Sequence, residues 1–538
     1  MRSLLASVLC TLFLLSVARA DVPPVAHDLL DPQMLADRAL RLLDPSHTGA
    51  VPGPSRATCG TATLMAVRSG WNDLPEKTRG RLALLLQQQG RPTTQAVTVS
   101  PSGRFRIHYD TSGLHAVALT DLNGNGVPDY VEEVGTTADS AWSLQIDGFG
   151  FHPPPSDGTV GGGAGQYDIY IQELSRSSAY GFTYPETTTT PTTTSYLEVD
   201  NNFTDKIYTS KGNDGLHVTI AHEFFHAIQF GYYSLFDAQW WQEVTAVWME
   251  DAAYPEVNDY YQYLPSFFDS PTVSLDRFLL FGDLHPFGSA VFIHNLHALF
   301  GITAMRAGWE RLAAQKAWDI QFINDALPGG FDQVFPRFVI WDYFTKTRAL
   351  PGYYREASAY PLVKTRSMLM KAGTALVDSG RVDHLGADYL QFKPGGQAGG
   401  LSITLTLASR ARWKVSVLLI QAGGVQIMES DGRQIRVPAW GQYDEIVVIP
   451  ICLSLTESGF TYRITAEVRS DILKPARAVG DFNVDGSVDF TDFFAFAEAY
   501  GKGAASAGFN PGCDLNGDGA VNLDDFFIFA VHFGETSG

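Results

Sequence analysis

The stretch on which the interpretation of this chain depends is Gly215-Leu-His-Val-Thr-Ile-Ala-His-Glu-Phe-Phe-His-Ala-Ile-Gln-Phe230. It contains an H-E-x-x-H pattern formed by His222, Glu223 and His226. On a helix, residues i and i+4 lie on one face, so two imidazoles at this spacing can hold one metal ion. Glu223 is offset by about 100° of helical turn and can act as a general base toward water beside the metal. The pattern predicts a catalytic zinc site on a helix.

A catalytic zinc ion takes three protein ligands and keeps one position open. The glycine and histidine that would continue a metzincin motif do not follow His226. A second helix is expected at 239–251, where Glu243 and Glu250 stand two turns apart on one face. Glu243 is the expected third ligand, and Glu250 or Asp251 is expected to orient a histidine. Glu250 as the ligand remains the alternative.

The composition is typical of an exported protein with several domains. The 538 residues exceed the size of one core, and a formal net charge of −20 argues against nucleic acid or an anionic membrane as a partner. Residues 1–20 predict a signal peptide, with Arg2, an apolar run and a small-x-small cleavage site ending at Ala20. No later segment reaches the roughly 18 apolar residues of a spanning helix, so we expect a secreted chain without a membrane span.

Residues 21–103 predict helices joined by proline and glycine turns, at His27–Leu43 and Glu76–Gln89. The region is either a pro-segment that shields a site or a plain helical subdomain. Three cysteines remain after the signal and cannot all pair: Cys59, Cys452 and Cys513. A bridge between the first two is left open.

Residues 104–365 predict an α+β domain of the zincin type. Three strand-like runs precede the H-E-x-x-H helix, at Phe105–Tyr109, Tyr167–Leu174 and Tyr196–Val199. In that order, the last strand edge can pair with an extended peptide. His285, just before a predicted helix, has two interpretations: it stabilises the oxyanion of the transition state, or it is a buried structural histidine.

Three loops follow the spacing of an EF-hand, in which oxygen ligands recur along a loop of about 12 residues with glycine at its sharp turn. The first loop supplies Asp121, Asn123, Asn125, Val127, Asp129 and Glu132. The other two form an internal repeat and supply Asp481, Asn483, Asp485, Ser487, Asp489 and Asp492, and then Asp514, Asn516, Asp518, Ala520, Asn522 and Asp525. We expect calcium in all three, with a plain polar turn before a helix as the alternative for the first.

Two further units are predicted in the C-terminal part. Alternating apolar residues at 366–473 predict a β-sandwich, and 474–538 holds the repeated loops, each followed by an apolar helix. From Asp481 onward there are ten acids and one lysine, and this charge would repel itself, so calcium should be needed for folding. Val488 and Val521 are expected to pair the two loops.

The H-E-F-F-H string with a downstream E-x-x-A resembles the gluzincin metallopeptidases. The longer strings I-A-H-E-F-F-H-A-I-Q-F-G-Y and W-x-E-x-x-A-x-W-M-E-D resemble a family of secreted bacterial metalloproteases within that group, over roughly residues 104–365. The resemblance implies a zinc peptidase with His222, His226 and Glu243 as ligands and Glu223 as base. The G-x-M-E-N element of the aminopeptidase branch is absent, so exopeptidase activity has no support.

The repeated tail resembles a type I dockerin, which implies structural calcium and a cohesin-like partner. Loop positions that help to select the cohesin, Phe490-Thr491 and Leu523-Asp524, depart from the usual small hydroxyl pair. Together the patterns predict a secreted, calcium-stabilised zinc endopeptidase acting on protein or peptide substrates. The alternative is a catalytically inactive secreted or surface-binding protein whose tail mediates calcium-dependent attachment. Only the peptidase hypothesis requires Glu223.

Overall fold

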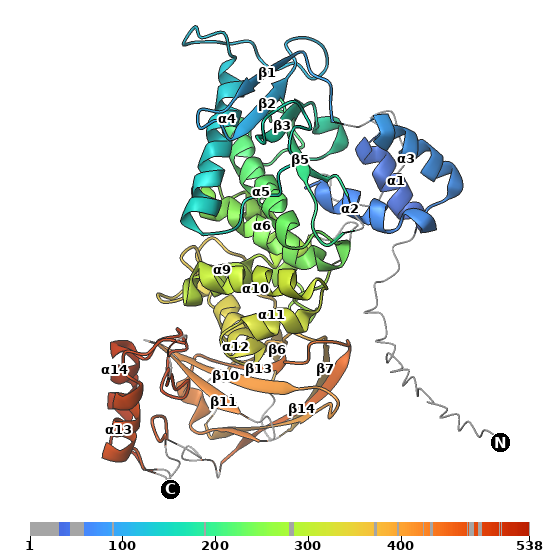
Figure 1. The fold of residues 1–538 in the computed structure, drawn as a ribbon. Helices are drawn as coiled ribbons and strands as arrows, with labels where there is room; N and C mark the ends of the chain where they lie inside the picture. The colour runs from blue at the N-terminus through green and yellow to red at the C-terminus, as the bar shows by residue number, and fades with distance from the viewer. Residues whose placement is uncertain are drawn as a thin grey trace, which may run out of the picture.

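The chain is a multidomain α+β protein, and its computed structural model shows a stack of units (Figure 1). A mixed sheet with helices lies at one end, more helices follow, and two further sheets with a helical tail lie at the other end. The structure describes residues 32–43, 59–88, 91–187, 190–278, 284–370, 374–394, 398–422, 424–430, 434–470, 472, 478–482, 487–504, 506 and 508–536.

The first sheet has the strand order β1-β2-β3-β5-β4. Its strands are β1 (Ala96–Val99), β2 (Phe105–Tyr109), β3 (Tyr167–Gln172), β4 (Gly181–Pro185) and β5 (Ser195–Asp200). β2, β3 and β5 run parallel, and β1 and β4 are antiparallel edge strands. The three predicted strands are confirmed. β1 lies before residue 104, so the sheet begins earlier in the chain than expected.

The edge strand β4 is a feature that the sequence does not predict. It ends in Pro185, and serine- and threonine-rich segments flank it, a composition typical of a loop. Proline is tolerated at that position because an edge strand leaves one row of backbone groups unpaired by the sheet. β4 pairs with β5 on one side, and on the other side its Gly181 carbonyl accepts a hydrogen bond from the backbone of Gly60.

The helices on the inner side of this sheet carry the predicted zinc motif. They are α4 (Asp129–Trp142), α5 (Gly212–Tyr232) and α6 (Gln239–Ala253). α5 is apolar on nearly all sides and is therefore buried between the sheet and α6. Its Phe224 contacts the rings of Phe105, Trp142 and Tyr167. The helices predicted around H-E-x-x-H and at 239–251 are confirmed.

The opposite face of the sheet is covered by the N-terminal helices (Figure 1). These are α1 (Pro32–Leu43), α2 (Thr61–Ser69) and α3 (Glu76–Gln88). Apolar residues of these helices share a core with Phe182 and Tyr184 of β4 and with Tyr196 of β5. The predicted helix at Glu76–Gln89 is confirmed, as is the described part of the one at His27–Leu43. The sequence does not predict α2.

Six further helices extend the main core toward the other end of the molecule: α7 (Leu264–Phe268), α8 (His285–Gly288), α9 (Val291–Phe300), α10 (Ile302–Gln315), α11 (Ile320–Ala326) and α12 (Gly330–Tyr343). None of the described helices is by itself long and apolar enough to cross a membrane. Only the pair His285–Phe300 and Ile302–Gln315 reaches that length and composition jointly, with a bend of 116° between its members.

Two sheets with a shared apolar core follow, as the alternation at 366–473 predicts. Their strand orders are β11-β10-β13-β8-β6 and β12-β9-β14-β7. The strands are β6 (Arg366–Met368), β7 (Leu376–Val382), β8 (Leu390–Phe392), β9 (Gly400–Leu407), β10 (Trp413–Gln421), β11 (Gly424–Ser430), β12 (Ile435–Val437), β13 (Glu445–Cys452) and β14 (Phe460–Arg469). Cys452 at the end of β13 is a free thiol, as are Cys59 and Cys513, so the bridge left open above is not formed.

The tail holds α13 (Phe490–Ala499) and α14 (Leu523–His532). Val488 exchanges backbone hydrogen bonds with residues 534 and 535, and Val521 does so with residues 501 and 502, so the expected pairing of the two valines is wrong. Each loop pairs instead with the segment that follows the helix of the other repeat, because that segment lies beside it in an antiparallel arrangement. The tail also touches α12, where Arg337 Nη2 lies 3.8 Å from Asp514 Oδ2.

The carboxyl of Glu198, on β5, makes stability depend on pH. Burial raises its pKa from a usual value near 4.5 to about 8. Between pH 4.5 and about 8, the folded chain therefore keeps a proton on Glu198 that the unfolded chain has released. The stability of the fold falls as pH rises through this window. We expect Glu198→Gln to remove the part of the stability loss that this carboxyl causes. The measurement is the melting temperature between pH 5 and 8.5, which shifts by roughly 2–4 °C for each kcal/mol of change in the free energy of unfolding. The exposed Glu256→Gln is the control, and equal pH profiles for the two variants would contradict the assignment.

Candidate metal centre

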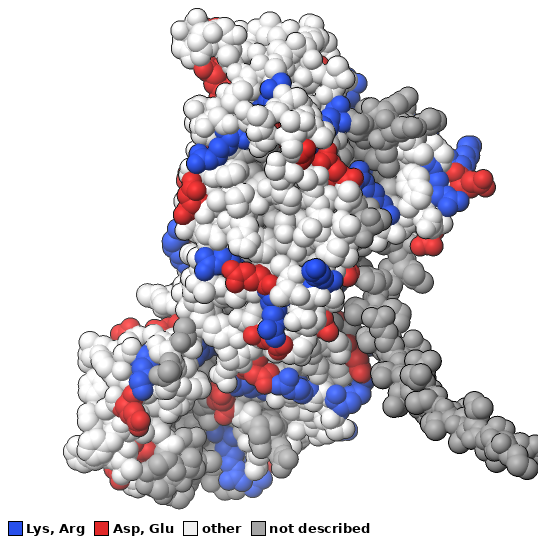
Figure 2. Space-filling model, viewed as in Figure 1, with Lys and Arg blue, Asp and Glu red and all other residues white. Residues whose placement is uncertain are grey.

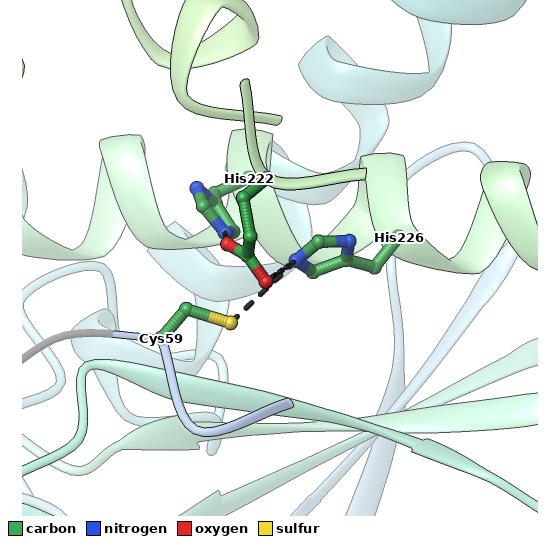
Figure 3. Close-up of side chains that lie close together, drawn as sticks. Cys59, His222 and His226 are labelled. Atoms are coloured by element: carbon green, nitrogen blue, oxygen red, sulfur yellow. Dashed lines mark hydrogen bonds and ion pairs between the residues drawn. The ribbon is translucent and has the colours of Figure 1, made fainter. Parts of the chain in front are cut away.

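Four buried side chains from three separate segments converge on one point. His222 and His226 lie on α5, Glu243 lies on α6, and Cys59 lies two residues before the start of α2. One ligand atom from each lies within 4.8 Å of all the others. Figure 3 shows the Cys59 sulfur and the two imidazoles directed toward a common space.

The distances between these atoms suit a tetrahedral metal ion. His222 Nε2 lies 3.5 Å from Glu243 Oε2, and His226 Nε2 lies 3.7 Å from Glu243 Oε1. Cys59 Sγ lies 3.5 Å from His226 Nε2. Zinc bonds of about 2.0–2.3 Å in a tetrahedron place neighbouring ligand atoms about 3.3–3.8 Å apart. Two nitrogens, one carboxylate oxygen and one sulfur are also ligand types that zinc accepts.

Each imidazole is held from behind by its other nitrogen. His222 Nδ1 lies 2.7 Å from Glu250 Oε1, and His226 Nδ1 lies 2.7 Å from Gln229 Oε1. Gln229 in turn donates to the Gln242 carbonyl of α6. These contacts leave both Nε2 atoms turned toward Glu243. The geometry therefore places Glu243 among the metal-facing atoms and Glu250 on the far side of the His222 ring.

Two atoms of the cluster are buried without a hydrogen-bond partner: His222 Nε2 and Glu243 Oε2. An unpaired buried polar atom costs about 1–3 kcal/mol, and more when it is charged. Burial raises the pKa of the Cys59 thiol, and Glu223 and Glu243 raise it further. Burial also opposes charge on Glu243, but the adjacent His226 and His222 hold its pKa below the usual value. A bound cation would satisfy both orphaned atoms and offset the negative charge, so the residues fit a metal ion.

Glu223 lies beside this cluster and is held by two threonines. Its Oε2 accepts a hydrogen bond of 2.9 Å from Thr61 Oγ1, at the start of α2. Thr183 Oγ1, on β4, lies 2.8 Å from the same oxygen. The cavity next to Cys59, His222 and Glu223 has a volume of about 20 Å³, which is room for about one water molecule.

Two other residues considered from the sequence lie apart from the metal-facing atoms. His285, at the start of α8, is buried and forms a hydrogen bond of 3.0 Å between its Nε2 and the Ser274 carbonyl. It does not belong to the residues that line the cavity. Asp251 Oδ2 lies 3.8 Å from His294 Nδ1, so among the two acids at this end of α6 it is Glu250 that holds a histidine of the motif.

The structure describes all of the predicted calcium ligands in the loop from 514, but only some of those in the loop from 481. In the loop from 514, the carboxylates of Asp514, Asp518 and Asp525 approach one another closely enough to hold a metal ion. Asp525 also forms a capping box with Asn522 at the start of α14, so helix capping accounts for part of this pattern. In the loop from 481, Asn483 and Asp485 lie outside the described residues, and Asp489 and Asp492 form the corresponding capping box of α13.

The loop from 121 is exposed and closed by its own side chains. Asp121 accepts hydrogen bonds from the backbone of residues 124–126, and Asn123 and Asn125 both donate to Glu132. Gly126 has φ +86°, the turn that the expected spacing requires of it. Polar contacts within the loop therefore bring its candidate ligands together.

Sequence reasoning missed Cys59, Thr61 and Thr183, and also Tyr263, whose ring lines the cavity. The sequence offers Cys59 only as a possible disulfide partner of Cys452, and nothing in its spacing relates it to a histidine pair far along the chain. The threonines belong to α2 and β4, the two elements near the site that the sequence does not predict. Their roles arise from packing between remote segments.

Comparisons with known proteins leave the family open. No protein-family model and no curated protein matches the chain. A mitogen from Yersinia pseudotuberculosis aligns with 18% of this chain and 88% of its own, at 15% identity and a TM-score of 0.16. PliG, a periplasmic inhibitor of g-type lysozyme from Salmonella Typhimurium, aligns with 20% of this chain and 98% of its own, at 11% identity and a TM-score of 0.15. A chain of a type II cohesin–X-dockerin complex from Acetivibrio cellulolyticus aligns with 24% of this chain and 85% of its own, at 21% identity and a TM-score of 0.12. Scores this low establish no shared fold.

The choice between Glu243 and Glu250 can be tested by metal affinity. We expect Glu243→Ala to weaken zinc binding more than Glu250→Ala does, because it removes an atom that faces both imidazoles. Glu250→Ala should lower zinc affinity by about 10–100-fold, because it removes only the support of one ring. Competitive titration with a zinc chelator measures both. A greater loss in Glu250→Ala than in Glu243→Ala would reverse the assignment.

The calcium assignment of the tail can be tested at Asp514. Burial raises the pKa of this carboxyl to about 7, with Arg337 acting in the opposite direction. We expect Asp514→Asn to weaken calcium binding by about tenfold or more, because the cation loses one of its few charged ligands. Asp524→Asn, an acid outside the ligand positions of the same loop, should bind like the wild type. A calorimetric titration that shows no calcium binding by the wild type would refute the assignment.

Proposed function

We propose that this protein is a secreted zinc-dependent peptidase, and specifically an endopeptidase. The observation that carries the proposal is the convergence of two imidazole nitrogens and the Glu243 carboxylate beside Glu223, all buried in one core. The signal-like start of the chain supports export. The residue types and their separations match those of a zinc site that hydrolyses a peptide bond.

In this proposal His222, His226 and Glu243 hold the metal ion. A zinc ion held by these residues would supply Lewis acidity toward the scissile carbonyl and the attacking water. Glu223 takes a proton from the attacking water and delivers it to the leaving amine. Thr183 fixes the carboxylate of Glu223 in this orientation, because its hydroxyl lies against Oε2 and the Glu223 backbone carbonyl.

The substrate in this proposal is an extended polypeptide. β4 is an edge strand that runs past Glu223, and its outward backbone groups can pair with a peptide strand. The Tyr263 phenol lines the cavity beside His222, and burial raises its pKa well above the usual value, so it stays protonated. A protonated phenol at this place can donate a hydrogen bond to the oxyanion of the transition state. His285 is not the donor in this proposal, because it does not line the cavity and its Nε2 is hydrogen-bonded to the Ser274 carbonyl.

A second function, attachment through the tail, is favoured by its exposed apolar side chains. Phe490, Phe494, Leu523, Phe527 and Val531 of α13 and α14 are each more than half exposed. Much of the tail's surface in Figure 2, at the lower left, carries no charged side chain. Exposed apolar area of this kind is typical of a protein-binding surface. We propose that the tail is a calcium-stabilised module of the dockerin type, with a cohesin-like domain as its partner.

The peptidase proposal is tested by Glu223→Gln. Because Cys59 lies against the metal-facing atoms, the comparison is made in chains that carry Cys59→Ser, with and without the second substitution. We expect Glu223→Gln to lower the rate of cleavage of denatured casein by about 10²–10⁴-fold, since it removes the general base. Zinc content per chain, measured in parallel, should be unchanged. Equal rates in two zinc-loaded chains that differ only at Glu223 would contradict the proposal.

A further inference from the structure

The segment Cys59-Gly60-Thr61 contacts three parts of the site that a substrate would need. Cys59 Sγ lies among the metal-facing atoms, 3.5 Å from His226 Nε2. The Gly60 backbone N–H donates to the Gly181 carbonyl of the edge strand β4, over 3.1 Å. The Thr61 hydroxyl donates to Glu223 and accepts a hydrogen bond from the backbone N–H of Thr183. One tripeptide thus reaches the metal position, the strand edge and the base.

The sulfur is directed toward the metal position by its surroundings. The backbone N–H of Thr61 donates to Cys59 Sγ over 3.4 Å, and this contact fixes the position of the sulfur. His222 Nε2 and Glu243 Oε2, both buried and without a hydrogen-bond partner, face the same centre. A metal held by two nitrogens, a carboxylate and this sulfur has four protein ligands. Four protein ligands are typical of closed zinc sites, whereas a catalytic site keeps one position open for water.

We propose that Cys59 is the fourth metal ligand, and that residues 59–61 hold the proposed peptidase in a latent state. This inference rests on the proposed function. The Cys59 thiolate occupies the position that water needs, and Thr61 engages the carboxylate that would take the proton. Gly60 pairs with the edge of β4 in place of a substrate backbone. Displacement of these three residues opens all three positions together.

The latent segment is held in place by α2, which begins at Thr61. Residues 61–67 of this helix are buried, and the Arg68 guanidinium donates to the carbonyl of Pro185 at the end of β4. Gly60 lies flat against β4, because a Cβ atom built on it would fall 2.0 Å from Cε1 of Phe182. A larger residue at this position requires displacement of the segment or of the buried Phe182 ring. The N-terminal helices therefore act as an inhibitory region that covers the strand edge.

The sulfur ligand is tested by zinc X-ray absorption on the full chain. We expect one sulfur at about 2.3 Å from zinc in the wild type, and none in Cys59→Ser or Cys59→Ala. Cys452→Ala, which changes a buried thiol of the sandwich, should keep the sulfur signal. Cobalt substitution gives a second measurement, since a thiolate ligand adds a charge-transfer band in the near ultraviolet. Absence of sulfur from the wild-type zinc shell would overturn the proposal.

Latency is tested by cleavage of casein. We expect Cys59→Ser and Cys59→Ala to cleave faster than the wild type, by on the order of tenfold or more, because the competent state is no longer a minor one. If these variants retain zinc and depend on Glu223 but cleave no faster than the wild type, latency is wrong while the peptidase proposal stands. If cleavage is independent of Glu223 in the Cys59→Ser chain, the peptidase proposal itself fails, and latency fails with it.

A matched pair of glycine variants tests the segment without altering a ligand. Gly60→Ala should push residues 59–61 off β4, raise the rate of casein cleavage, and speed the reaction of Cys59 with a thiol reagent. Gly80→Ala, in α3, should change neither, because a Cβ atom there meets nothing within 4 Å. Equal thiol reactivity and equal rates in the two variants would overturn the role given to this segment.

Discussion

The structure depends on the burial of ionisable groups between α5 and α6. Glu243 and His226 have no exposed surface, and His222 and Glu223 have almost none. Removing a charge from water costs several kcal/mol unless a partner of opposite charge compensates it. α5 and α6 can therefore pack at this place only if each charged atom meets a partner, and the cluster as a whole provides for one cation.

Several features of the surrounding fold follow from this constraint. Gln229 ties α5 to the backbone of α6, and Glu250 ties α6 back to His222, so the two helices are fixed in register at the cluster. The parallel strands β2, β3 and β5 then supply a rigid apolar floor on which α5 rests. Rigid support of this kind is what a catalytic metal site needs, because small displacements of its ligands are costly.

The N-terminal helices add a second level of constraint. They bury the outer face of the sheet, and in the same packing they place Cys59 and Thr61 against the site. The same packing of α2 along β4 therefore covers a hydrophobic face of the sheet and closes the site. Loss of these helices would expose aromatic side chains and the carboxyl of Glu198 together.

The local features of this chain can be recognised from residue spacing alone. The H-E-x-x-H spacing, the two glutamates two turns apart on the following helix and the repeated acidic loops are local patterns, so they can be recognised without knowledge of the fold. The same holds for the separation of the chain into an α+β part, a β-rich part and a helical tail. The sequence favours Glu243 as the ligand but leaves Glu250 as an alternative, because both stand on one helix face and helical spacing cannot tell which nitrogen of His222 each would meet.

Features that depend on contacts between remote segments became visible only in the folded chain. The tertiary structure set Glu243 against the Nε2 atoms and Glu250 against Nδ1 of His222. It also brought Cys59 to His226, across 167 positions of sequence. β4 has a composition typical of a loop and α2 is only 9 residues long, and packing of the two against each other stabilises both. Long-range packing of this kind leaves no periodic trace in either segment, so the sequence alone could not reveal it.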